Sequence, residues 1–255
     1  MTAFLESVNC EIEIHATNQQ QAQEKVRLFQ AMLYLEGIGP FIIPFFTNWS
    51  VNSYAGINSR DSDNLRSKLP PGLREGLTSK SGKVEAWLHE PTLKIIAMAN
   101  RNRVSPDTFR RAVGYAKEWQ CLEQKHAELV AARAALQTSP MIPEISSSLL
   151  HVWQGIESLF SGVSTEVTFR ISLLIAQLCS DKLSMKRTYQ TARESYKHRS
   201  NAAHGNLKKI GLHEWMEAWE LLRNCMIAVQ RRGKLVDEKI LIEELLEDGC
   251  TVEQN

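Results

Sequence analysis

The sequence lacks the features that mark secreted, membrane-spanning and zinc-stabilised proteins. Its cysteines are few and scattered, at Cys10, Cys121, Cys179, Cys225 and Cys250, and none has the spacing of a C-x-x-C or other zinc motif. An odd number of dispersed cysteines is typical of reduced thiols in the cytoplasm. The N-terminus shows no basic stretch followed by an apolar one, and no apolar run reaches the ~18 residues of a membrane span. We therefore expect a cytoplasmic protein with no membrane partner.

Cofactor-binding patterns are also missing. No glycine-rich loop is placed to cradle a nucleotide, and no cluster of His, Cys or carboxylate residues has the spacing of a metal site. The formal net charge is only +1 at pH 7, which argues against indiscriminate coating of nucleic acid but allows a local basic face. We expect a protein without cofactor or metal, whose 255 residues form one large domain or two smaller ones.

The first hundred residues contain short strand-like runs around one helix-like segment. Apolar residues at helical spacing predict a helix from Thr17 or Asn18 to about Glu36. Alternating or continuous apolar residues predict strands at 10–15, 41–47, 50–55, 84–89 and 93–99. Residues 58–83 are rich in Ser, Pro, Lys and Arg, which predicts a surface loop. Residues 1–103 are therefore predicted to form a small α/β domain that senses a ligand or selects a substrate.

The pattern becomes helical after Val104. A helix is predicted to start at Ser105, with Pro106 at the first helical position. Apolar residues at helical spacing predict helices at 106–136, 145–160, 167–178, from 182 onward, at 212–230 and at 240–246. We therefore predict an α+β protein, in which the small α/β domain is followed by an all-α bundle over residues 104–255.

One segment of the helical half is strongly basic. Between Lys182 and Lys209 there are eight Lys or Arg residues and a single acid, Glu194. This segment contains Arg199 and His204. A guanidinium is always charged and an imidazole titrates near neutral pH, so the two suit a phosphodiester-cleaving site without a metal. The alternative is a pair of cations that the helix dipole favours at a C-terminal end.

The reaction that would use both side chains is cleavage of RNA by its own 2′-OH. This hydroxyl attacks the adjacent phosphorus while one group takes its proton and another protonates the leaving oxygen. Arg199 would stabilise the charge that builds on the phosphorane oxygens, and His204 would act as acid or base. One His204 per chain cannot easily do both, which gives a physical reason to expect a two-fold dimer.

The spacing of this pair sets a geometric condition. Five residues along a continuous helix rotate a side chain by about 140°, so Arg199 and His204 would not share a face. Either the helix breaks at Ser200 and Asn201, which are good caps and poor residues inside a helix, or the pair forms across the dimer. Gly205 would let the backbone turn after His204 and expose the imidazole.

The wider pattern resembles the HEPN domain family, in its Apea-like group, over residues of about 105–235. The resemblance is carried by W-x3-E-x-L-F in LLHVWQGIESLF, by Arg170 in FRISLLIAQL, and by Y-x2-R-S-x3-H-G in SYKHRSNAAHG. It implies a dimerising bundle of four or five helices that often acts as a metal-independent ribonuclease. Arg199 and His204 would then be the catalytic pair, in a site shared by two subunits. HEPN toxins that carry a modified Tyr two residues after the His differ from this chain, which has Asn206 there.

Several residues near the motif have two interpretations each. Glu157 either orients the catalytic pair or is an ordinary exposed carboxylate. Tyr196 either stacks on a base or packs within the bundle. Arg193 and Lys197 either contact RNA phosphates or are simply solvated, and His198 is expected in solvent. Core positions are expected for Trp153, Trp215 and Trp219, the last two in the core or at a dimer interface.

The favoured interpretation is a HEPN-type endoribonuclease that cleaves RNA, in host defence or as a toxin-like effector, which is the setting the resemblance implies. Its partners would be RNA, a second copy of the chain and, in that setting, an antitoxin or other regulatory protein. The alternative is a non-catalytic HEPN-like module that binds RNA or a protein through the same basic face and leaves RNA uncut.

Overall fold

The computed structural model describes residues 11–43, 45–47, 84–86, 93–98, 101, 103–206 and 210–250. The chain divides into two compact units, one of residues 1–23 with 42–89 and one of residues 24–41 with 90–255. In the first unit, β1 (Phe45–Thr47) pairs antiparallel with β2 (Val84–Ala86). The second unit contains most of α2 and all the later helices, and it carries the candidate site.

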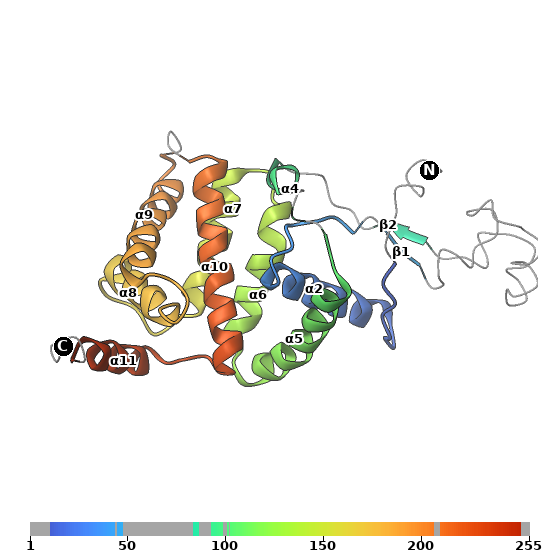
Figure 1. Cartoon of the computed structure of the whole chain (residues 1–255). Helices are drawn as coiled ribbons and strands as arrows, with labels where there is room; N and C mark the ends of the chain where they lie inside the picture. Colours follow the sequence, from blue (N-terminus) through green and yellow to red (C-terminus); the bar gives the residue numbers. More distant parts are fainter. Residues whose placement is uncertain are drawn as a thin grey trace, which may run out of the picture. The chain divides into compact units, whose positions relative to one another are not determined.

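The second unit is built around two central helices, α7 and α10. Its described helices are α2 (Gln19–Leu35), α4 (Leu93–Ala97), α5 (Pro106–Lys125), α6 (Glu128–Thr138), the 3₁₀ helix η3 (Ser139–Met141), α7 (Ile145–Ser158), α8 (Val167–Leu178), α9 (Met185–Ala203), α10 (Leu212–Arg232) and α11 (Glu238–Cys250). Helix α10 contacts α4 to α9, and α8 packs on α9 (Figure 1). Trp153 on α7 and Trp215 and Trp219 on α10 are buried, which confirms their predicted place in the core. None of the described helices combines the length and apolar character needed to cross a bilayer.

The predicted α/β domain, and with it the α+β fold class, is wrong. Apart from the three-residue strands β1 and β2, all the regular secondary structure among the described residues is helical. Residues 11–15 have no regular structure, and neither do 41–43. The predicted strand at 50–55 and the loop at 58–83 lie outside the described residues.

The predicted strand at 93–99 is instead helix α4. Lys94, Ile95 and Met98 are buried, at the spacing of one helical face. The Lys94 Nζ donates to the carbonyl oxygens of Ile142, at 2.6 Å, and Pro143, at 3.3 Å, in the segment before α7. A short apolar run does not distinguish strand from helix, so these contacts with the bundle decide the outcome. Burial lowers the pKa of Lys94, as expected for an ammonium partly removed from water.

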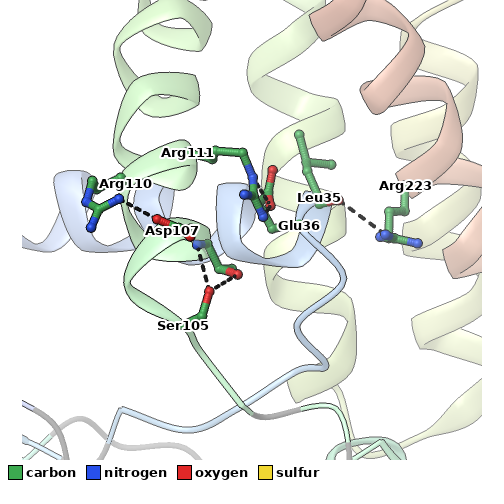
Figure 2. Close-up of polar contacts among 8 residues, drawn as sticks. Leu35, Glu36, Ser105, Asp107, Arg110, Arg111 and Arg223 are labelled. Atoms are coloured by element: carbon green, nitrogen blue, oxygen red, sulfur yellow. Dashed lines mark hydrogen bonds and ion pairs between the residues drawn. The ribbon is translucent and has the colours of Figure 1, made fainter.

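Helix α2 belongs to the bundle through its C-terminal half. Its residues Phe29–Leu35 are all buried. Arg223 on α10 donates to the last carbonyls of α2. Its Nε donates to Tyr34 at 2.6 Å. A terminal nitrogen donates to Leu35 at 3.2 Å (Figure 2). The Tyr34 carbonyl also accepts from the amide of Gly37 at 3.1 Å, and a cation at this end of the helix matches the helix dipole. On α5, Arg111 binds Glu36, which immediately follows α2, at 2.7 Å (Figure 2).

The predicted helix at 106–136 is two helices, because the chain turns at His126 between α5 and α6. Helices α6 and α7 approach so closely that a Cβ on Gly155 would lie 2.5 Å from the Cβ of Ala135. The other predicted helices of this half are confirmed, with ends that differ by at most a few residues. Helices α7 and α9 pack together, and the candidate site depends on this pair.

Candidate functional site

Helix α9 is continuous through the segment that contains Arg199, Ser200 and Asn201. It runs from Met185 to Ala203, so Ser200 and Asn201 lie inside it and do not break it. Of the two geometric alternatives, the helix break is therefore excluded. Within one chain, Arg199 and His204 lie on different sides of the helix.

The helix ends where the motif ends. His204 is the last residue of the helical turn, and its amide donates to the carbonyl of Ser200 at 3.1 Å. The amide of Asn206 reaches back to the carbonyl of Asn201 at 2.8 Å, and Gly205 has a φ of +72°. This is a glycine-based helix stop, and it leaves the His204 side chain exposed, as predicted. Ser200 and Asn201 therefore accept the backbone hydrogen bonds that close the end of α9 at His204, and their predicted supporting role in catalysis stays a prediction.

An exposed row of polar residues, here called the outer stripe, runs along α9 to His204. It consists of Lys186, Gln190, Arg193, Lys197 and His204, whose successive spacings of four, three, four and seven residues keep them within about 40° of one line on the helix. Arg193 and Lys186 form no hydrogen bond or ion pair with the residues that the structure describes, whereas Lys197 pairs with Glu194 at 2.7 Å. His204 therefore shares a face with the two predicted RNA-binding residues. Lys186 and Gln190 were not singled out from the sequence, although the same periodicity identifies them.

Arg199 lies on the side of α9 that packs against α7. Its guanidinium forms an ion pair with Glu157 of α7, with the nearest nitrogen and oxygen 3.1 Å apart. It also lies over the ring of Tyr196, 5.5 Å from the centroid. Tyr196 in turn meets Trp153 edge to face at 5.1 Å, and the Trp153 indole donates to Ser195 at 3.2 Å. Glu157 thus contacts and orients Arg199, and Tyr196 packs within the bundle.

The surroundings of Arg199 restrict it without fully enclosing it. The Arg199 and Glu157 side chains are 30% and 29% exposed. The Arg199 Nε is buried and has no hydrogen-bond partner among the described residues. Burial is the largest influence on Tyr196 and raises the pKa of its hydroxyl, so this residue is neutral near pH 7 and unsuited to be a base. Part of the Arg199 side chain is therefore open to a ligand, while its unpaired Nε is not.

The expectation for His198 is wrong. Its side chain is only 14% exposed, and its Nδ1 is buried without a hydrogen-bond partner among the described residues. The position follows from the helix, because Ser195 and Ala202, three residues before and four after, are also buried. His198 lies near Glu214 of α10, whose pKa is lowered chiefly by backbone hydrogen bonds and to a smaller extent by His198. His198 is therefore not part of the outer stripe.

Arg170, which contributes to the resemblance, lies elsewhere. It binds Glu238 of α11 and, at 2.9 Å, the hydroxyl of Thr165. Around it is a shallow depression of about 420 Å³ that includes Asp237 and Glu243. The acids of this depression are unfavourable for a phosphate chain, so it is not part of the candidate site.

No group of three or more His, Cys, Asp or Glu residues in the described part of the chain could hold a metal ion. Comparisons with protein-family models, with curated proteins and with solved structures give no match to this chain. The candidate functional residues therefore lie on two sides of α9: the Arg199 cluster against α7, and the outer stripe that ends at His204.

Proposed function

We propose that this protein is a metal-independent endoribonuclease whose site is completed by two copies of the chain. One observation carries the proposal: an exposed imidazole, His204, ends a row of cations that includes Arg193, which has no partner among the described residues. A row of exposed cations attracts a phosphate backbone, and an imidazole at its end can exchange protons near neutral pH. Arg199, held by Glu157 on the other side of the helix, supplies the second charge that the reaction needs.

The reaction would be attack of the RNA 2′-OH on the neighbouring phosphorus. One His204 takes the proton of the 2′-OH as the new P–O bond forms, and the His204 of the second copy protonates the departing 5′ oxygen. The products are a 2′,3′-cyclic phosphate and a free 5′-OH. The Arg199 guanidinium donates to the phosphorane oxygens, whose negative charge grows in the transition state.

The continuity of α9 supports a site made by two copies. Because the helix does not break before His204, Arg199 and His204 of one chain face different sides. A two-fold axis near the end of α9 would bring His204 of each copy toward Arg199 of the other. Such an arrangement also supplies the two imidazoles that acid and base catalysis require.

The test is cleavage of labelled RNA in the presence of EDTA. The wild-type protein is expected to cut and to leave 2′,3′-cyclic phosphate ends, and His204→Ala to reduce the rate by about 10²- to 10⁴-fold. His213→Ala is the matched control, because His213 is also exposed, at 79%, but lies on α10 outside the outer stripe. Equal rates for the wild type and His204→Ala would exclude the proposed role of the imidazole.

The second candidate function is a non-catalytic module that binds RNA through the outer stripe. The Arg199–Glu157 ion pair favours it, because the pair already uses part of the donor capacity that catalysis would need. Under this alternative, RNA binding would weaken with salt while no cleavage product formed with any RNA or in any buffer.

A further inference from the structure

The surface beside the outer stripe carries an exposed aromatic pair. Phe169, in the first turn of α8, is 52% exposed and is the one exposed aromatic among the side chains that the structure describes. Its ring meets that of Tyr189 on α9 edge to face, with centroids 6.3 Å apart and planes at 77°. Helices α8 and α9 lie side by side here (Figure 1). The contact holds the Phe169 ring in place while half of its surface stays open to water.

This pair adjoins the cations of the outer stripe. Tyr189 is three residues after Lys186 and four before Arg193, the two spacings at which side chains are neighbours on a helix. Neither cation has a hydrogen bond or ion pair among the described residues. An open aromatic ring beside unpaired cations is the arrangement that binds single-stranded nucleic acid, in which bases stack on rings while phosphates contact the cations.

We infer that Phe169 and Tyr189 form a base-stacking subsite, so that the RNA held by the outer stripe is single-stranded. The inference rests on the proposed RNA binding by α9 and adds the class of substrate. In a duplex the bases are stacked on each other and their faces are closed to a protein ring, whereas an unpaired base is free to stack. Fifteen residues separate Tyr189 from His204, about 22 Å along the helix axis, so the stacked base lies several nucleotides from the scissile linkage.

A second copy of the chain is a less suitable occupant of this surface. A two-fold axis through the aromatic pair would bring Lys186 and Arg193 of one copy toward the same residues of the other, and like charges would repel. RNA brings phosphates to these cations instead. The two occupants differ in their consequences, because only the second copy makes the oligomeric state depend on Phe169.

The experiment measures binding of a fluorescently labelled single-stranded RNA, and of its duplex, in a His204→Ala background, in which cleavage is expected to be about 10²- to 10⁴-fold slower. Phe169→Leu removes the ring and keeps apolar bulk, and we expect it to weaken single-strand binding by about 5- to 100-fold with duplex binding unchanged. Val130→Ala is the matched control, an exposed apolar residue on α6, and is expected to change neither. Light scattering on the same samples reports the oligomeric state.

Three results would overturn the subsite: unchanged single-strand affinity in Phe169→Leu, equal loss for single strand and duplex, or a change in oligomeric state that accounts for the loss. The cleavage assay separates this inference from the proposed nuclease. Loss of cleavage in His204→Ala with unaltered binding in Phe169→Leu would remove the subsite alone. Binding that depends on Phe169 without cleavage by the wild type would remove the nuclease alone, and no RNA binding at all would remove both.

Discussion

The two sides of α9 carry similar residues in different situations. On the side facing α7, Arg199 has a carboxylate partner and an aromatic neighbour, and Ser195 accepts from a buried indole. On the outer stripe, Arg193 is exposed and has no partner among the described residues, and His204 ends the row. The difference shows that charge alone does not define a binding face. Packing against α7 restrains Arg199 and leaves it only 30% exposed, whereas the outer stripe is exposed along its whole length.

The largest expected effect is on the inner side. Trp153→Ala removes a fully buried indole that contacts Tyr196 and Ser195, and we expect the free energy of unfolding to fall by about 3–5 kcal/mol. Phe169→Ala removes an exposed ring and is expected to change it by about 0.5 kcal/mol or less. Urea unfolding measures both. Similar losses for the two variants would contradict the division between inner and outer aromatic residues.

The next effect concerns the ion pair between α7 and α9. Glu157→Gln leaves the Arg199 charge about 70% buried without its partner, and a loss of about 1–2 kcal/mol in unfolding free energy is expected, together with slower cleavage. Glu194→Gln breaks the exposed pair with Lys197 and should cost nearly nothing. A double-mutant cycle of Glu157→Gln with Arg199→Gln measures the coupling. Zero coupling energy would mean that the pair does not hold the guanidinium.

A smaller effect, on the salt dependence of RNA binding, distinguishes Arg193 from Lys197 in the outer stripe. Arg193→Gln is expected to lower the slope of log affinity for single-stranded RNA against log salt by about 0.7, one phosphate contact. Lys197→Gln should lower it less, because Glu194 already offsets the Lys197 charge, and Glu194→Gln should strengthen binding. Fluorescence anisotropy from low to physiological salt measures these slopes. Equal slopes in the wild type and Arg193→Gln would remove Arg193 from the binding face.

The smallest expected effect is on the pH dependence of stability, through Glu144 at the start of α7. Hydrogen bonds from the Ser146 hydroxyl and then the Ser147 amide lower the pKa of Glu144 to about 2. Because the folded-state pKa is below the unfolded one, this contribution is present above about pH 4.5 and is lost as the pH falls toward 2. Glu144→Gln should cost up to about 1 kcal/mol at pH 7 and progressively less below pH 4.5, with RNA binding unchanged. A cost that stayed constant down to pH 2.5 would contradict the assignment.

The sequence allowed most of the helical half to be predicted, because periodicity reports burial. The bounds of α8 were predicted correctly, and Trp153 was correctly placed in the core. Helix α4 was missed because its apolar run is short and its Lys94 finds partners far along the chain, at Ile142 and Pro143. Secondary-structure propensity is read from neighbouring residues, so it gives no information on such long-range contacts.

For the candidate site, the sequence could not determine which of the named residues contact one another. The contact between Glu157 and Arg199 was one of two interpretations, and only the packing of α7 on α9 decided it. The burial of His198 could have been inferred from its spacing to Ser195 and Ala202. The contact of Phe169 with Tyr189 could not, because it depends on how α8 lies against α9.

Mixed dimers test whether the proposed site is shared by two chains. Wild-type chains and His204→Ala chains are co-expressed in varied proportions, and RNA cleavage is measured in EDTA. If both imidazoles are needed, activity follows the square of the wild-type fraction, so equal amounts give about a quarter of the full rate. A rate of about half at equal amounts would show that each chain cleaves alone, and it would contradict the shared site.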